Sequence, residues 1–269
     1  MTHKVQVEIE APVATITLNK PERLNALDVE MWEAIGGAAE AIDAAPGVRV
    51  AILMGAGGAF CAGLDVKAGS TLSELGLEDS PAKALPAIRR HLGRLQSCFS
   101  RLEACRVPVI GALERICIGG GLELALCCDI RLAAEGTIFS IPEVRLGIVP
   151  DMGGTQRLPR TVGIGLAKEL IYSARRVDAA EALRIGLVNA VHPAGDLQAR
   201  VAELAAEIAA NAPLAVQAAK RSINGTYWRE IGSWLDREAA EAAGPLLSED
   251  RKEGMWAAAE RKRANFRGR

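Results

Sequence analysis

The stretch from Cys117 to Arg157, CIGGGLELALCCDIRLAAEGTIFSIPEVRLGIVPDMGGTQR, carries most of the information in this sequence. Three consecutive glycines, 119–121, precede a segment with helical character that runs to about Cys128. A helix that starts in this way offers free backbone N–H groups and the positive end of its dipole, which together suit an oxyanion. The stretch therefore predicts an anion-stabilising turn at the start of a helix.

Three acidic residues lie within the same stretch, among apolar and glycine-rich sequence. Glu123 falls in the first turn of the expected helix, Glu143 follows Pro142 near another helix start, and Asp151 precedes two glycines. A carboxylate in apolar surroundings is costly unless it is used or exposed. We therefore take all three as candidate catalytic acids, with a helix N-cap or a surface position as the alternative for each.

Outward from this stretch, apolar strands alternate with helical segments, which indicates an α/β fold. Asp28 is the expected N-cap of a helix that runs to about Ala45, and Asp178-Ala-Ala-Glu181 resembles a capping box. From about Met152 onward the pattern is mainly helical. Strands are expected over residues 5–10, 13–19, 48–54, 107–113, 129–134 and 188–191, and a helix over about 82–106.

The composition excludes several classes of protein. The chain has 269 residues and a formal net charge of −1, so charge gives no reason to expect nucleic-acid binding. The longest uncharged stretch, 50–64, is too short for a membrane span, and the first residues do not resemble a signal or transit peptide. The six cysteines form no Cys-x-x-Cys motif, so we expect reduced, buried thiols and a cytoplasmic location.

Several familiar motifs fail on inspection. Gly55-Ala-Gly57 follows a strand, but Phe60 stands where a dinucleotide-binding loop needs its third glycine. Residues 58–63 have the glycine spacing of a P-loop, but Leu64-Asp65 replaces its Lys-Ser/Thr. The histidines have no ligand-like spacing, so we expect no metal site and a surface or turn position for each: His3, His91 and His192.

The sequence resembles the crotonase superfamily, which comprises the enoyl-CoA hydratases and isomerases. The resemblance covers nearly the whole chain and depends on several motifs together, each of which alone would be weak. They are LNKP at 18–21, LNAL at 24–27, FCAGLD at 60–65, the stretch 117–157, GGTQRLP at 153–159 and AAEALRIGLVNAV at 179–191.

The resemblance implies a fold and an assembly. The expected fold is α/β, with a spiral core of stacked β-β-α turns of the ClpP/crotonase kind over residues 1–194. A helical trimerisation region is expected over residues 195–269, giving a homotrimer or a dimer of trimers. The expected partner is an acyl-CoA thioester, and no cofactor is expected because coenzyme A is part of the substrate.

The resemblance also implies site residues. The positions that match the family's two carbonyl-binding backbone N–H groups are Leu64 and Gly120. Glu123 and Glu143 match the two glutamates with which hydratases activate a water molecule and add it across the 2,3 double bond. Reversible hydration of a 2-enoyl-CoA through a stabilised enolate is therefore the first expectation.

Asp151 supports a second expectation. Familiar hydratases have glycine at this position, whereas dienoyl-CoA isomerases have aspartate and shuttle protons with the acids that match Glu143 and Asp151. Carnitinyl-CoA dehydratases resemble this stretch as well. The bulky Leu64 is closer to the isomerases, whereas Gly153-Gly154-Thr155 is the hydratase form, so both chemistries stay open.

Contacts to coenzyme A are the least determined part of the site. The resemblance places backbone of residues 62–67 along the adenine and pantetheine and a basic residue near the diphosphate, and a helix N-cap is the alternative for Asp65. A non-catalytic CoA- or RNA-binding relative is a third hypothesis, because residues 251–269 are basic. The expected CoA-binding residues are Arg23, Ala62, Gly63, Asp65, Val66 and Lys67.

Overall fold

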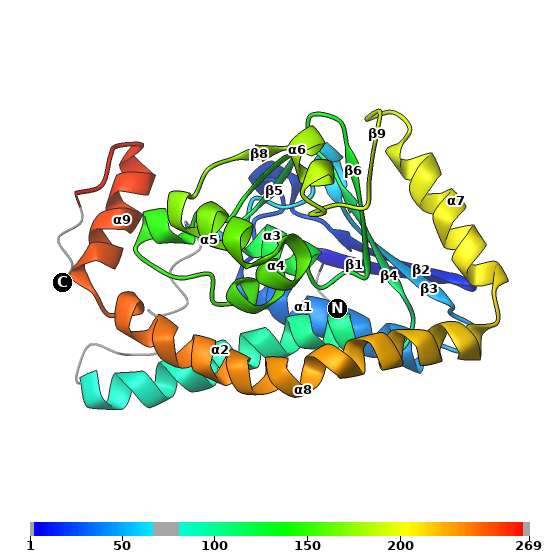
Figure 1. Ribbon diagram of the computed structural model, residues 1–269, viewed down its shortest axis with the longest axis horizontal. Coiled ribbons are helices and arrows are strands. Elements are labelled where there is room, and N and C mark those ends of the chain that lie inside the picture. The colour runs from blue at the N-terminus through cyan, green and yellow to red at the C-terminus, as the bar shows by residue number, and fades with distance from the viewer. Residues whose placement is uncertain (1–2, 67–80, 266–269) are drawn as a thin grey trace.

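The computed structural model describes residues 3–66 and 81–265, and within them the fold is α/β, as predicted (Figure 1). Its strands are β1 (Val5–Glu10), β2 (Val13–Leu18), β3 (Val50–Gly55), β4 (Val109–Leu113), β5 (Ile116–Ile118), β6 (Ile130–Ala134), β7 (Ile138–Ser140), β8 (Val177–Asp178) and β9 (Ala190–His192). Its α-helices are α1 (Val29–Ala44), α2 (Pro81–Ala104), α3 (Gly120–Ala125), α4 (Gly154–Val162), α5 (Ile164–Ser173), α6 (Ala179–Arg184), α7 (Leu197–Ala210), α8 (Pro213–Leu246) and α9 (Glu249–Glu260).

The larger sheet has the strand order β1-β2-β3-β4-β6-β9. β1 and β2 form an antiparallel hairpin, and every later neighbour in this sheet pairs in parallel. Parallel strands that are covered on both faces read as nearly continuous apolar runs, and VAILMG in β3 and VIGAL in β4 have that composition. Alternate residues of these strands therefore face two different layers.

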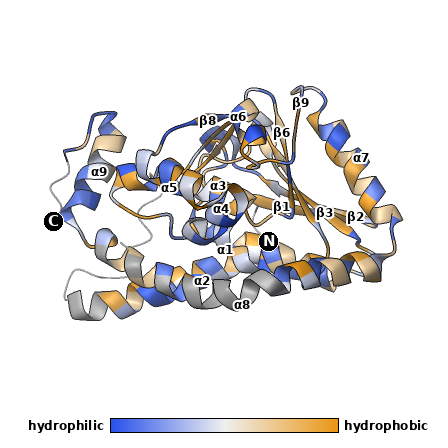
Figure 2. Ribbon diagram, in the orientation of Figure 1, coloured by the Kyte–Doolittle hydropathy of each residue, from blue (hydrophilic) through white to orange (hydrophobic). Residues whose placement is uncertain are grey.

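Helices cover both faces of the larger sheet. Ala51 and Leu53 of β3 belong to the main core, which also contains buried residues of α1, α2 and α3. Val50 and Ile52, on the other face, pack against the apolar side of α7. Figure 1 shows α7 along one side of the sheet and the long α8 beside α2, and in Figure 2 the strands are largely hydrophobic while α7 is mixed in hydropathy.

A smaller sheet, of order β5-β7-β8, lies beside α3. β5 and β7 are parallel, and an isolated parallel bridge joins Cys61 to Cys117, the middle residue of β5. This bridge brings the loop after β3 against the segment that leads into α3. The smaller sheet therefore positions two backbone segments that are far apart in the sequence.

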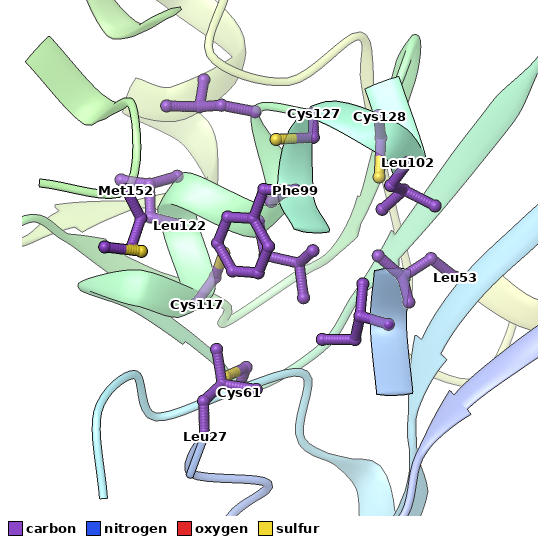
Figure 3. Packing of buried hydrophobic residues seen from close by; sticks show 14 of the residues in the cluster. Leu27, Leu53, Cys61, Phe99, Leu102, Cys117, Leu122, Cys127, Cys128 and Met152 are labelled. Atoms are coloured by element: carbon purple, nitrogen blue, oxygen red, sulfur yellow. The ribbon is translucent and has the colours of Figure 1, made fainter. Parts of the chain in front are cut away.

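The core is filled by aliphatic side chains, a few aromatic rings and sulfur. Figure 3 shows Cys61 beside Leu27 and Cys117 close to Leu122 and Phe99, with Cys127 and Cys128 at the far end of the same cluster. All six cysteines are buried free thiols, as expected from their spacing. Burial raises the pKa of the Cys61 thiol to about 12, so it behaves as an apolar group.

Several local predictions are confirmed and one is wrong. Asp28 caps α1 by accepting a hydrogen bond from Met31 N at 3.1 Å, and Asp178 caps α6 in the same way through Glu181 N at 2.8 Å. His91, expected at the surface or in a turn, is buried in α2. It lies between Ile88 and Leu95 at helical spacing, and therefore on the helix face that packs inward.

The chain from Leu197 to Glu260 is mostly helical, in α7, α8 and α9. α7 packs on the larger sheet, so its apolar side belongs to the same fold as the strands. No helix of the described residues is long and apolar enough to cross a membrane. The division into a core of residues 1–194 and a trimerisation region of residues 195–269 stays a prediction.

Candidate active site

The turn before α3 brings two backbone N–H groups together. Gly63 and Gly119 have positive φ values of 86° and 54°, a conformation that glycine adopts most easily. A Cβ atom on Gly63 would lie 2.6 Å from Ile118 O and 3.3 Å from Gly120 N, so the two segments touch at this point. The loop and the helix start can approach this closely only because both carry glycine.

Among the described residues, neither Leu64 N–H nor Gly120 N–H donates a hydrogen bond to the rest of the chain. Gly120 is the first residue of α3, whose early N–H groups lack intrahelical acceptors. Both residues line one pocket. The predicted carbonyl-binding pair is thus brought together, and an oxygen atom placed between the two donors would find both of them available.

Glu123 projects from α3 into the same pocket and is almost completely buried, with 1% of its surface exposed. Its Oε1 atom accepts hydrogen bonds from Met152 N at 3.0 Å and from Gly154 N at 2.8 Å. Burial, followed by the neighbouring carboxyl groups of Glu143 and Asp151, raises its pKa well above the usual value. The two N–H donors act in the opposite direction, because they favour the charged form.

Glu143 begins the short 3-10 helix η4 (Glu143–Leu146), directly after Pro142, as the sequence predicted. It is 7% exposed, and its buried Oε2 atom has no hydrogen-bond partner. Burial, with a further contribution from Asp151, raises its pKa to about 8. Glu143 is therefore a carboxyl group that keeps its proton at neutral pH and has one oxygen atom free to act.

Asp151 lies at the third corner of the pocket, in the turn that leads into α4. Its backbone is held by Gln96 of α2, whose side chain donates to Asp151 O at 2.7 Å. Burial, and then the charge of Glu238, raises its pKa to about 7. The three acids, which lie within 29 residues of the sequence from Glu123 to Asp151, thus meet at one pocket.

A fourth acid, Glu238 of α8, lies behind the pocket and was missed in the sequence. It is buried, and its carboxyl group accepts hydrogen bonds from Gly153 N at 2.7 Å and from Thr155 N at 3.1 Å, as well as from the Thr155 hydroxyl. Burial raises its pKa to about 7. Glu238 fixes the turn whose N–H groups hold Glu123, and no local pattern in the sequence links it to that turn.

The remaining walls of the pocket are mostly apolar, and one wall comes from the end of the chain. The cavity volume of the pocket is about 60 Å³. The described apolar and basic lining residues are Trp32, Leu92, Leu95, Ile148, Met152, Leu246, Arg251 and Met255.

The expected coenzyme A contacts lie on the loop that precedes the undescribed segment. Asp65 is buried and forms ion pairs with Lys20 at 2.8 Å and with Arg23 at 2.6 Å. The Arg23 side chain is one-third exposed, so it reaches the surface beside this loop while bound to Asp65. Val66 is exposed, and Lys67 lies outside the described residues.

The backbone of this loop is held in place on both sides. Ala62 N donates to Leu24 O at 2.9 Å, and the Gly63 carbonyl accepts from Leu27 N at 2.7 Å. A parallel bridge joins Leu27 and Leu64. The loop that carries the expected adenine and pantetheine contacts is therefore anchored to the LNAL motif.

The arrangement can stabilise negative charge and move protons. Two free N–H donors can hold an oxyanion, and preorganised donors of this kind are worth roughly 3–4 kcal/mol each in other oxyanion holes. Protonatable carboxyl groups beside them can remove and deliver protons near neutral pH. No group of three potential metal-ligating side chains occurs in the described part of the chain.

Comparisons with known proteins agree with this chemistry. The chain matches the enoyl-CoA hydratase/isomerase family over residues 8–269. It is 39% identical to a crotonyl-CoA hydratase of Syntrophomonas wolfei, over 97% of this chain and 96% of that protein. It is 34% identical to a peroxisomal Δ(3,5)-Δ(2,4)-dienoyl-CoA isomerase of Arabidopsis thaliana, over 97% and 95%.

A solved structure supports the same relationship. An enoyl-CoA hydratase from Mycobacterium avium subsp. paratuberculosis superposes with a TM-score of 0.86 at 28% identity, covering 99% of this chain and 100% of that one. The predicted crotonase-like core is thereby confirmed.

Proposed function

Because the chain belongs to the enoyl-CoA hydratase/isomerase family, we propose that it reversibly adds water to a 2-enoyl-CoA thioester in the pocket of Glu123 and Glu143. The family membership makes it an enzyme of the hydratase or isomerase type that acts on an acyl-CoA thioester.

The thioester oxygen lies between Leu64 N–H and Gly120 N–H. When water attacks C3 of the enoyl group, the electrons of the double bond move toward C2 and the thioester oxygen takes up negative charge. The two donors stabilise this enolate, and they do so without rearrangement because the glycine-rich backbone already holds them in place.

The two glutamates divide the proton transfers. Glu123, whose Oε1 atom is held by two N–H donors, is the carboxylate that takes the proton from the attacking water. Glu143, with its raised pKa and free Oε2 atom, delivers its own proton to C2. One proton enters the pair and one leaves it, so the total charge of the pair is unchanged. The starting state returns when a proton passes from Glu123 to Glu143, directly or through water.

The observation that supports this proposal best is the difference between the two buried carboxyl groups. Like charges this close disfavour double ionisation, so one group stays protonated. Hydration needs one base and one acid at the same moment, and the backbone donors favour Glu123 as the base.

Isomerisation is the second candidate, and Asp151 favours it. Its pKa of about 7 lies close to the value of about 8 at Glu143, so the two groups could remove a proton at one carbon and deliver one at another. A dienoyl-CoA isomerase is among the relatives of the chain.

One experiment separates the two chemistries. The purified protein is incubated with a 2-enoyl-CoA, a 3,5-dienoyl-CoA and a 3-hydroxyacyl-CoA, and the products are analysed by mass spectrometry and ultraviolet absorbance. Gain of water on the first substrate and loss of water from the third support hydration. Conversion of the dienoyl substrate at unchanged mass, with no hydration, would replace our proposal by isomerisation.

The remaining expectations are also proposals. We propose that Arg23, Asp65 and the loop backbone contact coenzyme A, that no further cofactor is needed, and that the chain works in the cytoplasm as a trimer or a dimer of trimers. Arg23 can reach a diphosphate with the guanidinium nitrogens that Asp65 does not use. Saturation binding of coenzyme A to the wild type and to an Arg23→Met variant tests that contact.

A further inference from the structure

The pocket contains two buried hydrogen-bond donors for which the proposed hydration has no use. Among the described residues, Trp32 Nε1 and Arg251 Nε have no hydrogen-bond partner, and both residues line the pocket. Glu143 Oε2 is unpartnered too, but proton transfer accounts for it. A buried donor without an acceptor destabilises the empty pocket, so an acceptor on the bound substrate is expected.

Arg251 is the only cationic residue on the described walls of this pocket. No carboxyl group of the described residues forms an ion pair with it, and burial is the one cause that lowers the pKa of its guanidinium. Three acids of its own helix have other partners: Glu249 pairs with Lys252 at 2.8 Å, Glu253 accepts from Asn265 N at 2.9 Å, and Glu260 pairs with Lys262 at 3.6 Å. Its positive charge is therefore left for something that enters the pocket.

The position of Arg251 within α9 favours the same conclusion. It lies in the first turn, after the N-cap Ser248, where the positive end of the helix dipole disfavours a cation. An anion bound at this point would be attracted by the guanidinium and by the helix start together. Binding of an anionic group would therefore offset the unfavourable interaction between the guanidinium and the start of α9.

The packing of α9 fixes this arginine in place. A Cβ atom on Gly147 would lie 2.7 Å from Arg251 N, and one on Gly254 would lie 2.6 Å from the Leu146 carbonyl carbon. Both contacts press the start of α9 against η4, the element that begins with Glu143. The cation and the catalytic acid are therefore held on adjoining elements with little freedom between them.

We propose that the acyl chain of the natural substrate ends in a carboxylate, which Arg251 binds inside the pocket. This inference rests on the proposed hydration and specifies its substrate class: a 2-enoyl-CoA derived from a dicarboxylic acid. The apolar walls formed by Leu92, Leu95 and Met255 accommodate the methylene groups. The guanidinium, with planar paired donors, matches the terminal carboxylate.

The test compares hydration of paired substrates. For chains of five, six and eight carbons, kcat/KM is measured for the 2-enoyl-CoA with a terminal carboxylate and for the unsubstituted 2-enoyl-CoA of equal carbon number. We expect at least one carboxylate-bearing substrate to exceed its unsubstituted partner by about 10-fold or more.

Two variants assign the preference to its residue. Arg251→Met should lower kcat/KM for the preferred carboxylate substrate by about 10-fold or more and reduce the ratio to its partner toward one. Lys252→Met, which removes a cation from the next position of the same helix, should leave that ratio unchanged, because Lys252 is exposed and pairs with Glu249.

The outcomes separate this inference from the function on which it rests. Hydration of unsubstituted substrates with no preference for a carboxylate at any length would overturn the inference alone. A preference that survives in Arg251→Met would overturn the role of this arginine. Failure to hydrate any substrate of either series would overturn the proposed function itself.

Discussion

At the scale of single residues, the site depends on how the same carboxyl group behaves in different surroundings. Glu123 is held by two backbone donors, whereas Glu143 has one oxygen atom with no partner. Both are buried, so their pKa values are raised. In the proposed mechanism, local contacts rather than residue type therefore decide which of them acts as the acid and which as the base.

Replacing Glu143 by glutamine should lower kcat for hydration by at least about 10²-fold, because an amide cannot deliver a proton to C2. Initial rates with a 2-enoyl-CoA measure this. Glu207→Gln, at an exposed position of α7, is the matched control and should keep full activity. A loss smaller than 10-fold in Glu143→Gln would contradict the assigned role.

The pH dependence of kcat should report Glu143. Its acid form is needed, so kcat should fall as pH rises through about 8. Asp151 is one of the charges that raise this pKa, and Asp151→Asn should therefore move the fall to lower pH while hydration continues. If kcat of Asp151→Asn fell at the same pH as that of wild type, Asp151 and Glu143 would not be coupled. Loss of hydration in this variant would favour the isomerase roles.

Glu143 should also lower the free energy of unfolding at pH values above the pKa that it has in the unfolded chain. Its folded pKa of about 8 is higher than the usual 4.5, so the folded state holds the proton more tightly. The resulting stabilisation is complete below about pH 4.5 and is lost as pH rises to about 8. Glu143→Gln should have the same free energy of unfolding as wild type at pH 4.5 and a free energy of unfolding larger by up to about 5 kcal/mol at pH 8. Urea unfolding at both pH values measures this, and equal stability at pH 8 would refute it.

At the scale of elements, the sequence allowed correct prediction wherever a local rule decides. Asp28 and Asp178 cap helices because the side-chain oxygen of each can accept a hydrogen bond from the unpaired backbone N–H three residues later. α3 ends at Ala125, earlier than the expected Cys128, because the chain there turns toward β6. β5, β7 and β8 were not predicted, since two- and three-residue strands carry too little periodicity.

The start of α4 offers a test of how tightly its backbone holds the Glu123 side chain of α3. A Cβ atom on Gly154 would lie 2.7 Å from Glu123 Oε1, so Gly154→Ala should displace the base and lower kcat by about 10-fold or more. Gly37→Ala in α1, where a Cβ atom meets nothing within 4 Å, is the control and should stabilise its helix by about 1 kcal/mol. Unchanged kcat in Gly154→Ala would mean that Glu123 is not held there.

At the scale of the whole molecule, the sequence predicts the fold and three acids of the candidate site. It does not predict the part of the site that comes from α8 and α9. Glu123, Glu143 and Asp151 were found because they lie within one glycine-rich stretch. Glu238 and Arg251 were missed as site residues because α8 and α9 bring them there from far along the chain. Only the folded chain shows such long-range neighbours.

The proposed assembly is also a property of the whole molecule. Several large apolar side chains are exposed on the helical surfaces, among them Ile164, Tyr172 and Leu214. We expect light scattering after size exclusion to give three or six times the chain mass of 28.4 kDa. A monomer at micromolar concentration would contradict the trimer that the family resemblance implies.

The contact between Glu238 and the Gly153–Thr155 turn has a consequence for biosynthesis. A ribosome makes every strand of both sheets and all of the proposed catalytic acids before it makes α8. The nascent chain can therefore pair its strands while the turn that orients Glu123 still lacks its anchor. Catalytic competence should appear as a late event of translation, separated in time from the folding of the sheets.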